Sequence, residues 1–440
     1  MPTTTISRQI LHLAVPAFGA LIAEPLFLLA DSAIVGHLGV DQLAGVGLAA
    51  TVLQTAVGLL VFLAYSTTPA VARLLGAGRL ADALAVGRDG LWLAVLLGFG
   101  LAITGYALAA PALGLLGASG PVLDFGIEYL RFSMPGLPAM LLVLAATGVL
   151  RGLQDTRTPL LVAGVGFMVN IALNLLLVFG LGHSVAGSAL GTSIAQWGMA
   201  GVYLVIVARA ARQHGVQLAP DWAGIRAVSR VGSWLMLRTL SLRTAILATV
   251  LVATAQGAVN LAAHQLAMTI FTFLAFALDA LAIAAQALVG KELGAENVLR
   301  VKELTGTMVR WGLVFGAGTG LLLLGAGPWA GWLFTPDHGV HAALASALLV
   351  LAIGQPLAGL VFVLDGVLIG AGDARYLALA GVANLLVYLP LLFWVSAAAR
   401  TGPGGLGWLW AAFALGYMAA RALSLGLRAR STRWMRAGAH

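Results

Sequence analysis

The feature that most constrains this chain is an internal repeat, because the landmarks of the first half of the sequence return in the second half at a constant offset of 218 positions. Leu75-Gly76-Ala77 matches Leu293-Gly294-Ala295. The longer segment 148–155 matches 366–373 at its two glycines, its Val-Leu pair and its aspartate. One offset held without drift is not expected from chance similarity between segments rich in Leu, Ala and Gly. The sequence therefore predicts two homologous halves.

Composition places both halves in a membrane. Hydrophobic residues make up 60% of the chain, charged residues only 9%, and the mean hydropathy is +0.98. A soluble globular domain carries roughly 25% charged residues. The apolar runs reach about 20 residues, the length that a helix needs to cross a bilayer, and they lack the alternation of a β-barrel strand. The chain has no cysteine, which excludes disulfides and thiolate metal sites.

The apolar runs predict an all-α membrane protein with twelve transmembrane helices, arranged as two homologous six-helix bundles around a central cleft. The predicted helices lie near residues 10–35, 43–70, 86–110, 123–150, 159–181, 186–208, 228–254, 261–289, 305–327, 341–370, 376–398 and 406–427.

The same pattern divides the chain into four parts. We expect an N-terminal six-helix lobe at 8–208, a cytoplasmic inter-lobe linker at 209–225, a C-terminal six-helix lobe at 226–427 and a basic cytoplasmic tail at 428–440. Two homologous halves in a membrane protein are typical of a transporter.

The distribution of basic residues predicts the orientation. With these helices, 19 of the 24 Lys and Arg residues fall on the side shared by both termini, and only Arg131 and Arg400 fall on the other. The positive-inside rule then places both termini in the cytoplasm of a multi-pass protein of the plasma (inner) membrane. The net charge of +8 reflects this topology, and no solvated basic domain is present that would favour a nucleic-acid partner.

The first predicted helix carries two acids, Glu24 and Asp31, which are seven residues apart and so lie on one face. A carboxylate at membrane depth is usually protonated, paired or in contact with water. For Asp31 we favour a functional role, because no basic neighbour is obvious. For Glu24 a structural pairing and a functional role stay open. Pro16 and Pro25 interrupt the backbone hydrogen bonds of the same helix and favour a hinge there.

Two further helices carry polar pairs. Asn170 and Asn174 are four residues apart, which stacks both amides on one face. Two amides on one face suit the lining of a wet cavity better than a single asparagine between helices does. Thr192 and Gln196 form a similar but weaker pair in the next helix.

The second half carries its own buried charges. Asp279 and Asp365 lie inside the eighth and tenth predicted helices, and Arg238 and Arg243 on the seventh are their candidate partners. We favour a second-lobe polar network of buried ion pairs over a second ion site. No histidine pattern of a metal site and no catalytic motif occurs, so we expect no metal, no cofactor and no enzyme. An ion gradient then has to supply the energy.

The chain resembles the multidrug and toxic-compound extrusion (MATE) family, in its DinF-like branch. The segments that carry the resemblance are 25–39, 148–159, 278–290 and 362–373, and the likeness runs from about residue 8 to 427.

The resemblance implies two six-helix lobes with a cleft open to one side at a time, and export of bulky, often cationic organic compounds in exchange for protons or sodium. It also implies that Asp31 is the protonation site, that Pro16 is a hinge, and that Asn170, Asn174 and Thr192 line the cavity. In some relatives the second helix-five position is aspartate. Here it is Asn174, which favours protons over sodium.

Alternatives remain at this stage. Sodium-coupled efflux of an endogenous metabolite is one, and a lipid-linked precursor flippase of the same superfamily is another. A flippase is expected to carry a cluster of basic residues in its cavity, whereas only three arginines, Arg238, Arg243 and Arg421, are assigned to neither side of the membrane. The expected partners are small cationic or amphipathic substrates and membrane lipid, and the protein is expected to be a monomer.

Overall fold

The computed structural model describes residues 2–398 and 403–438. Within these ranges the chain forms helices and turns, and twelve helical segments are long and apolar enough to cross a membrane. The prediction of an all-α protein with twelve transmembrane helices is therefore confirmed. Arg400, which the predicted topology assigns to the non-cytoplasmic side, lies outside the described residues.

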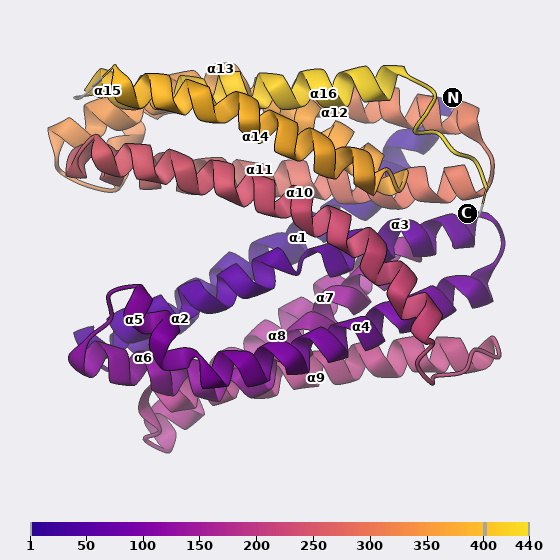
Figure 1. Cartoon of the computed structure of the whole chain (residues 1–440), viewed down its shortest axis with the longest axis horizontal. Helices are drawn as coiled ribbons and strands as arrows, with labels where there is room; N and C mark the ends of the chain where they lie inside the picture. The colour runs from indigo at the N-terminus through magenta and orange to yellow at the C-terminus, as the bar shows by residue number, and fades with distance from the viewer. Residues whose placement is uncertain (1, 399–402, 439–440) are drawn as a thin grey trace. The chain divides into compact units, whose positions relative to one another are not determined.

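The first half supplies six of the twelve spans, and Figure 1 shows its long helices side by side. Its elements are α1 (Pro2–Gly36), α2 (Val40–Leu59), α3 (Phe62–Gly76), α4 (Leu80–Ala107), α5 (Ala109–Leu115), α6 (Gly120–Ser133), η1 (Met134–Gly136), α7 (Leu137–Gly152), α8 (Arg157–Leu175), η2 (Leu176–Gly180) and α9 (Ser184–Gln213).

The second half supplies the other six spans. Its elements are α10 (Trp222–Ala255), α11 (Ala258–Gly294), α12 (Val298–Ala330), η3 (Gly331–Leu333), α13 (His338–Gly370), α14 (Ala374–Ala397), α15 (Pro403–Trp410), η4 (Ala411–Tyr417) and α16 (Met418–Arg430).

The repeat is visible in the backbone as well as in the sequence. Three pairs of turn residues at equivalent positions of the two halves all have positive φ, a conformation that glycine adopts most easily. The pairs are Gly39 and Gly257, Gly78 and Glu296, and Gln154 and Gly372. Equivalent turns therefore have equivalent geometry even where only one of the two residues is glycine.

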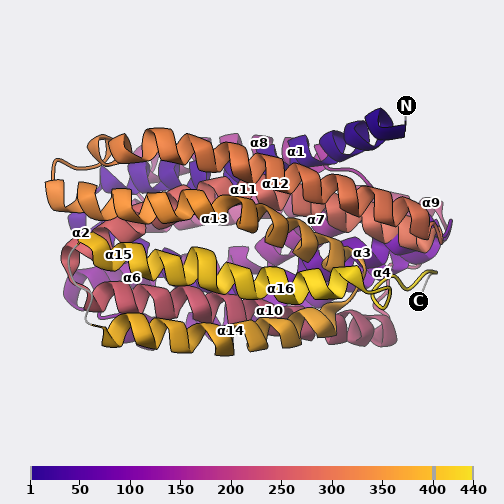
Figure 2. The same ribbon diagram turned by 90° about the horizontal axis from the view of Figure 1, so that it is seen from above.

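Packing inside each half depends on small residues. In the second half, α12 lies along α13 (Figure 2). Gly312, Gly316 and Gly320 form a stripe on α12, and a Cβ atom at any of them would overlap a backbone carbonyl of α13. Such stripes let two helix backbones approach closely in a membrane, where packing replaces the hydrophobic effect. In the first half Gly98 meets Pro138, and at the equivalent positions of the second half Gly316 meets Pro356.

The contacts divide the chain into two compact units, which we call the first unit (Val15–Gly232) and the second unit (residues 2–14 with Ser233–Gly438). Both divisions fall inside helices, since α1 changes unit between Ala14 and Val15 and α10 between Gly232 and Ser233. These two positions are again equivalent in the repeat. The first helix of each repeat thus belongs to both units.

The predicted inter-lobe linker at 209–225 is too long. Helix α9 continues to Gln213 and α10 begins at Trp222, which leaves only 214–221 between them. This short link is fastened to α4, because Arg88 Nη1 donates to the carbonyl of Gln217 at 2.9 Å and Trp92 Nε1 donates to that of Leu218 at 2.9 Å. The predicted linker is too long because polar residues at a helix end resemble a loop in the sequence.

The predicted tail at 428–440 is basic, but its start is helical and part of it is packed. Helix α16 continues to Arg430, and Arg428 Nε donates to Asp373 at 2.6 Å. Further on, Trp434 is buried and the Gly438 N–H donates to the carbonyl of Leu293 at 3.0 Å. The described part of the tail therefore belongs to the fold of the second unit.

Candidate functional site

A buried carboxylate in the first unit is held by three other helices. Asp31 on α1 is 6% exposed. It accepts hydrogen bonds from Ser188 Oγ on α9, from Asn174 Nδ2 on α8 at 2.9 Å and from Tyr129 Oη on α6 at 3.2 Å. We call these four residues, together with Asn170 and Thr192, the Asp31 cluster. All its members lie in the first unit.

Helical spacing builds the rest of the cluster. Because Asn170 and Asn174 are one turn apart on α8, the Nδ2 of Asn174 also donates to the Oδ1 of Asn170 at 3.1 Å. The Nδ2 of Asn170 in turn donates to Thr192 Oγ1 at 3.0 Å. The backbone of Gly191 makes room for this chain, since a Cβ there would overlap the Oδ1 of Asn174. The result is a continuous hydrogen-bonded path from Asp31 to Thr192.

The donors around Asp31 are all neutral. Two hydroxyls and one amide contact the carboxylate, and within the described residues no Lys, Arg or His forms an ion pair with it. A buried carboxylate usually carries a fixed countercharge or a metal. Asp31 can therefore take a proton or a cation without first breaking an ion pair.

The sequence pointed to four of the six cluster residues. Asp31, Asn170, Asn174 and Thr192 are brought together, whereas Tyr129 and Ser188 were missed. Ser188 lies one turn before Thr192 on α9, so extending the Thr192–Gln196 stripe backwards finds it. Tyr129 comes from α6, and nothing in the local sequence links α6 to α1.

The remaining candidates of α1 lie outside the cluster. Glu24 is exposed, and it is not part of the hydrogen bonds described above for the cluster. Pro16 and Pro25 are both inside α1, which continues through them as one helix from Pro2 to Gly36. Pro16 comes directly after the point at which α1 changes unit.

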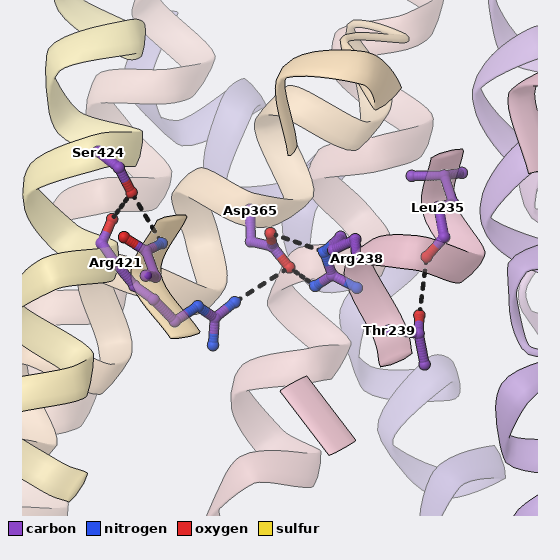
Figure 3. Close-up of polar contacts among 7 residues, drawn as sticks. Leu235, Arg238, Thr239, Asp365, Arg421 and Ser424 are labelled. Atoms are coloured by element: carbon purple, nitrogen blue, oxygen red, sulfur yellow. Dashed lines mark hydrogen bonds and ion pairs between the residues drawn. The ribbon is translucent and has the colours of Figure 1, made fainter. Parts of the chain in front are cut away.

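The second unit contains a separate polar network around Asp365 of α13 (Figure 3). Arg238 of α10 holds both carboxylate oxygens, with Nε donating to Oδ1 at 3.1 Å and Nη2 donating to Oδ2. Arg421 of α16 approaches Oδ2 from another side at 3.6 Å and is within electrostatic range of Asp279. The structure therefore joins Arg238 to Asp365 and adds Arg421, which the sequence did not indicate as a partner. It leaves Arg243 exposed and outside the network, without a hydrogen bond or ion pair among the described residues.

The repeat explains why the two networks differ. At the position equivalent to Asp31 the second half carries Thr249, whose hydroxyl lies 2.7 Å from that of Tyr388, the equivalent of Asn170. The position equivalent to Asp365 is Thr147, which donates to Tyr203 at 3.5 Å. Tyr203 is itself equivalent to Arg421 of the second half. Each unit thus has its buried charge where the other has a neutral pair of hydroxyls.

Metal chemistry has no visible site in the described parts of the chain. Residues 2–398 and 403–438 contain no group of three or more His, Asp or Glu side chains that could hold a metal ion.

Comparison with known families identifies the same repeat. The model of the family described as MatE matches the chain twice, at residues 16–176 and 234–394. The two matches begin and end at equivalent positions of the repeat, which confirms two homologous halves.

Curated relatives agree with this match. The chain is 32% identical over 242 residues to DNA damage-inducible protein F of Escherichia coli, a match that spans 54% of this chain and 53% of that protein. It is 30% identical over 417 residues to Protein DETOXIFICATION 44, chloroplastic, of Arabidopsis thaliana, covering 91% of this chain and 78% of the relative.

Solved structures share the fold. A MATE transporter of Vibrio cholerae in the bent form has a TM-score of 0.88 at 22% identity, covering 98% of this chain and 99% of that one. An outward-facing multidrug resistance MATE family transporter has a TM-score of 0.87 at 23% identity, covering 98% and 96%. From the repeated family match, the relatives and the twelve-helix fold, the chain is a DinF-like member of the MatE family, and it is therefore a transporter and not an enzyme.

Proposed function

We propose that this protein is a proton-coupled antiporter that exports organic cationic or amphipathic compounds by alternating access between its two lobes. The observation that carries the proposal is the Asp31 cluster, a buried carboxylate surrounded by neutral donors. An ionised Asp31 attracts a cationic substrate, and a protonated Asp31 does not. Proton uptake and substrate release then exclude each other at one group, which is what antiport requires.

The position of Asp31 on α1 links protonation to movement. Three helices, α6, α8 and α9, hold the ionised carboxylate through hydrogen bonds. A protonated carboxyl accepts fewer hydrogen bonds and itself becomes a donor, so the preferred packing of α1 changes. Pro16 and Pro25 weaken the backbone hydrogen bonds along this helix and let it bend.

Protons suit this cluster better than sodium. Hard metal cations prefer several oxygen ligands in their coordination shell. Around Asp31 the hydroxyls of Ser188 and Tyr129 and the amide of Asn174 all direct donors at the carboxylate, and the cluster contains a single acid. A sodium ion bound here would therefore meet only one negative charge. Sodium-coupled efflux remains the alternative that the experiment below decides.

Proteoliposomes with imposed gradients test the coupling ion. Purified protein is reconstituted with a fluorescent organic cation, and transport is followed under a proton gradient or a sodium gradient of equal magnitude. We expect transport against the substrate gradient with protons alone. Transport that requires sodium and does not respond to the proton gradient would contradict the proposal.

Most of the Lys and Arg residues lie in loops on one side, which supports an orientation with both termini in the cytoplasm of a cell whose inner membrane holds the protein.

A further inference from the structure

The chain carries a basic surface where the last span ends. Residues 428–438 contain four arginines and neither Asp nor Glu. Three of them, Arg430, Arg433 and Arg436, are exposed, and we call these three the tail arginines. Among the described residues, their side chains form no hydrogen bond and no ion pair. Their guanidinium groups are therefore available to a ligand.

The segment that carries the tail arginines is held in place at several points. Trp434 is 2% exposed, and its Nε1 donates to the carbonyl of Ala429 on α16 at 3.1 Å. The Gly438 N–H donates to the carbonyl of Leu293, in the last turn of α11, at 3.0 Å. A ligand of the tail arginines does not have to order this backbone, which lowers the entropic cost of binding.

The acids of this region do not neutralise it. Asp373 already pairs with Arg428 at 2.6 Å. Glu292 and Glu296 flank the α11 end that Gly438 contacts, but no ion pair among the described residues joins either of them to a tail arginine. Against these three acids the region holds six basic residues, namely the tail arginines with Lys291, Arg375 and Arg428. The surface therefore keeps an excess of positive charge.

One face of α16 continues this surface into the membrane. Leu423 and Leu427 are 63% and 58% exposed, and Arg430 follows Leu427 by three residues. Because residues three and four positions apart share one face of a helix, the two leucines and Arg430 form one stripe. Exposed leucines in a span meet acyl chains, and an arginine at the end of the span lies at the level of the headgroups. The stripe thus matches a ligand with an apolar body and an anionic head.

We propose that the tail arginines bind the phosphate group of an anionic membrane lipid whose acyl chains lie along Leu423 and Leu427. Guanidinium groups form paired hydrogen bonds with phosphate oxygens, and a basic segment directly after a span attracts anionic lipids. The equivalent stretch of the first half, 210–220, contains a single arginine, Arg212. The site therefore belongs to the second unit alone, and it does not rest on the role of Asp31.

Thermal unfolding of the delipidated protein in detergent tests the site. Phosphatidylglycerol, which is anionic, is compared with zwitterionic phosphatidylcholine at equal concentrations and low salt. We expect phosphatidylglycerol to raise the unfolding temperature until the site is saturated, and phosphatidylcholine to raise it much less, since a ligand that binds the folded state stabilises it. Glycerol phosphate lacks acyl chains and should not reproduce the effect. Equal effects of the two lipids, or a full effect of glycerol phosphate, would overturn the proposal.

Two variants of equal charge assign the effect to the tail. Replacing the three tail arginines with glutamine should raise the half-maximal concentration of phosphatidylglycerol roughly a hundredfold, or about fivefold for each arginine. The control variant removes three exposed arginines of the first unit and should keep the natural response; it carries Arg209→Gln, Arg212→Gln and Arg226→Gln. An equal loss in both variants would mean that the lipid responds to net charge and not to a site. That result, or a tail variant with the natural response, contradicts the proposal.

Discussion

Asp31 stands where the other half of the molecule has a hydroxyl, Thr249. The surrounding helices are repeated, so the difference between the units comes from single side chains and not from the fold. Around Asp31 the neighbours are Asn170 and Ser188, which donate or relay hydrogen bonds, whereas Thr249 meets the phenol of Tyr388. One unit thereby gains a buried group that can change its charge at this position.

Replacing Asn174 with aspartate tests how much the single acid matters. In Asn174→Asp the new carboxylate lies within hydrogen-bonding distance of Asp31, whose Oδ1 is 2.9 Å from the present amide nitrogen. Two adjacent carboxylates repel when both are ionised, so a cation or a proton has to lie between them. We expect the variant to gain a sodium-dependent rise in unfolding temperature that the natural protein lacks. A variant that is indifferent to sodium would show that the second carboxylate does not create a cation site.

The cluster also shows which residues of a site can be predicted from the sequence and which cannot. Spacing along one helix is local, so the sequence alone is enough to place Asn170 and Asn174 on one face. Tyr129 and Arg421 could not be found in the same way. Each reaches its acid from a different helix, and the packing of that helix is decided by the whole bundle.

The next scale is that of whole helices. In the second unit, the glycine stripe of α12 determines how closely α12 and α13 pack. A side chain at Gly316 would overlap the backbone carbonyl of Gln355 on α13, whereas Gly318, two residues on, has no atom within 4 Å of an added Cβ. The two glycines therefore differ in their surroundings although they are neighbours on one helix.

This pair gives a matched test of the packing. Gly316→Leu has to push α12 away from α13 and should destabilise the second unit by about 3 kcal/mol or prevent folding. Gly318→Leu meets open space and should leave the unfolding temperature within a few degrees of that of the natural protein. Thermal unfolding in detergent compares the two variants. Equal unfolding temperatures would mean that α12 and α13 do not pack through their backbones as described.

At the scale of elements, the number and order of the spans could be predicted, because a run of about twenty apolar residues rarely forms anything other than a transmembrane helix. Their ends could not be predicted as well. Helix α9 continues to Gln213 and α10 starts at Trp222, so both enter the region predicted as linker. The backbone N–H and C=O groups of a helix bond to each other whether lipid or water surrounds the helix. Hydropathy therefore predicts which residues lie in the bilayer, but not where the helix ends.

For the whole molecule, the internal repeat organises the fold, the turns and the points at which α1 and α10 change unit. The two halves have even numbers of spans, so they should have the same orientation in the membrane. The chain contains no cysteine, which makes single-cysteine labelling direct.

Topology can be checked with a membrane-impermeant maleimide. Arg79→Cys and Arg300→Cys lie in equivalent regions of the two halves and should both be labelled only when the cytoplasmic face is open to the reagent. His183→Cys lies in the turn between η2 and α9, which the predicted topology assigns to the non-cytoplasmic side, and it should be labelled from outside. If the cysteines at 79 and 300 were labelled from opposite faces, the predicted orientation of the two halves would be wrong.

The most direct test of the central claim is transport by Asp31→Asn. The substitution keeps the size of the side chain and removes the group that takes up the proton. Reconstituted in proteoliposomes with an imposed proton gradient, this variant should fold and insert normally but lose gradient-driven export of an organic cation. Asp82→Asn, the same change at an exposed acid paired with Arg79, should export at the natural rate. Export by Asp31→Asn against a substrate gradient at the natural rate would contradict the account, because Asp31 could then not be the group that couples protons to transport.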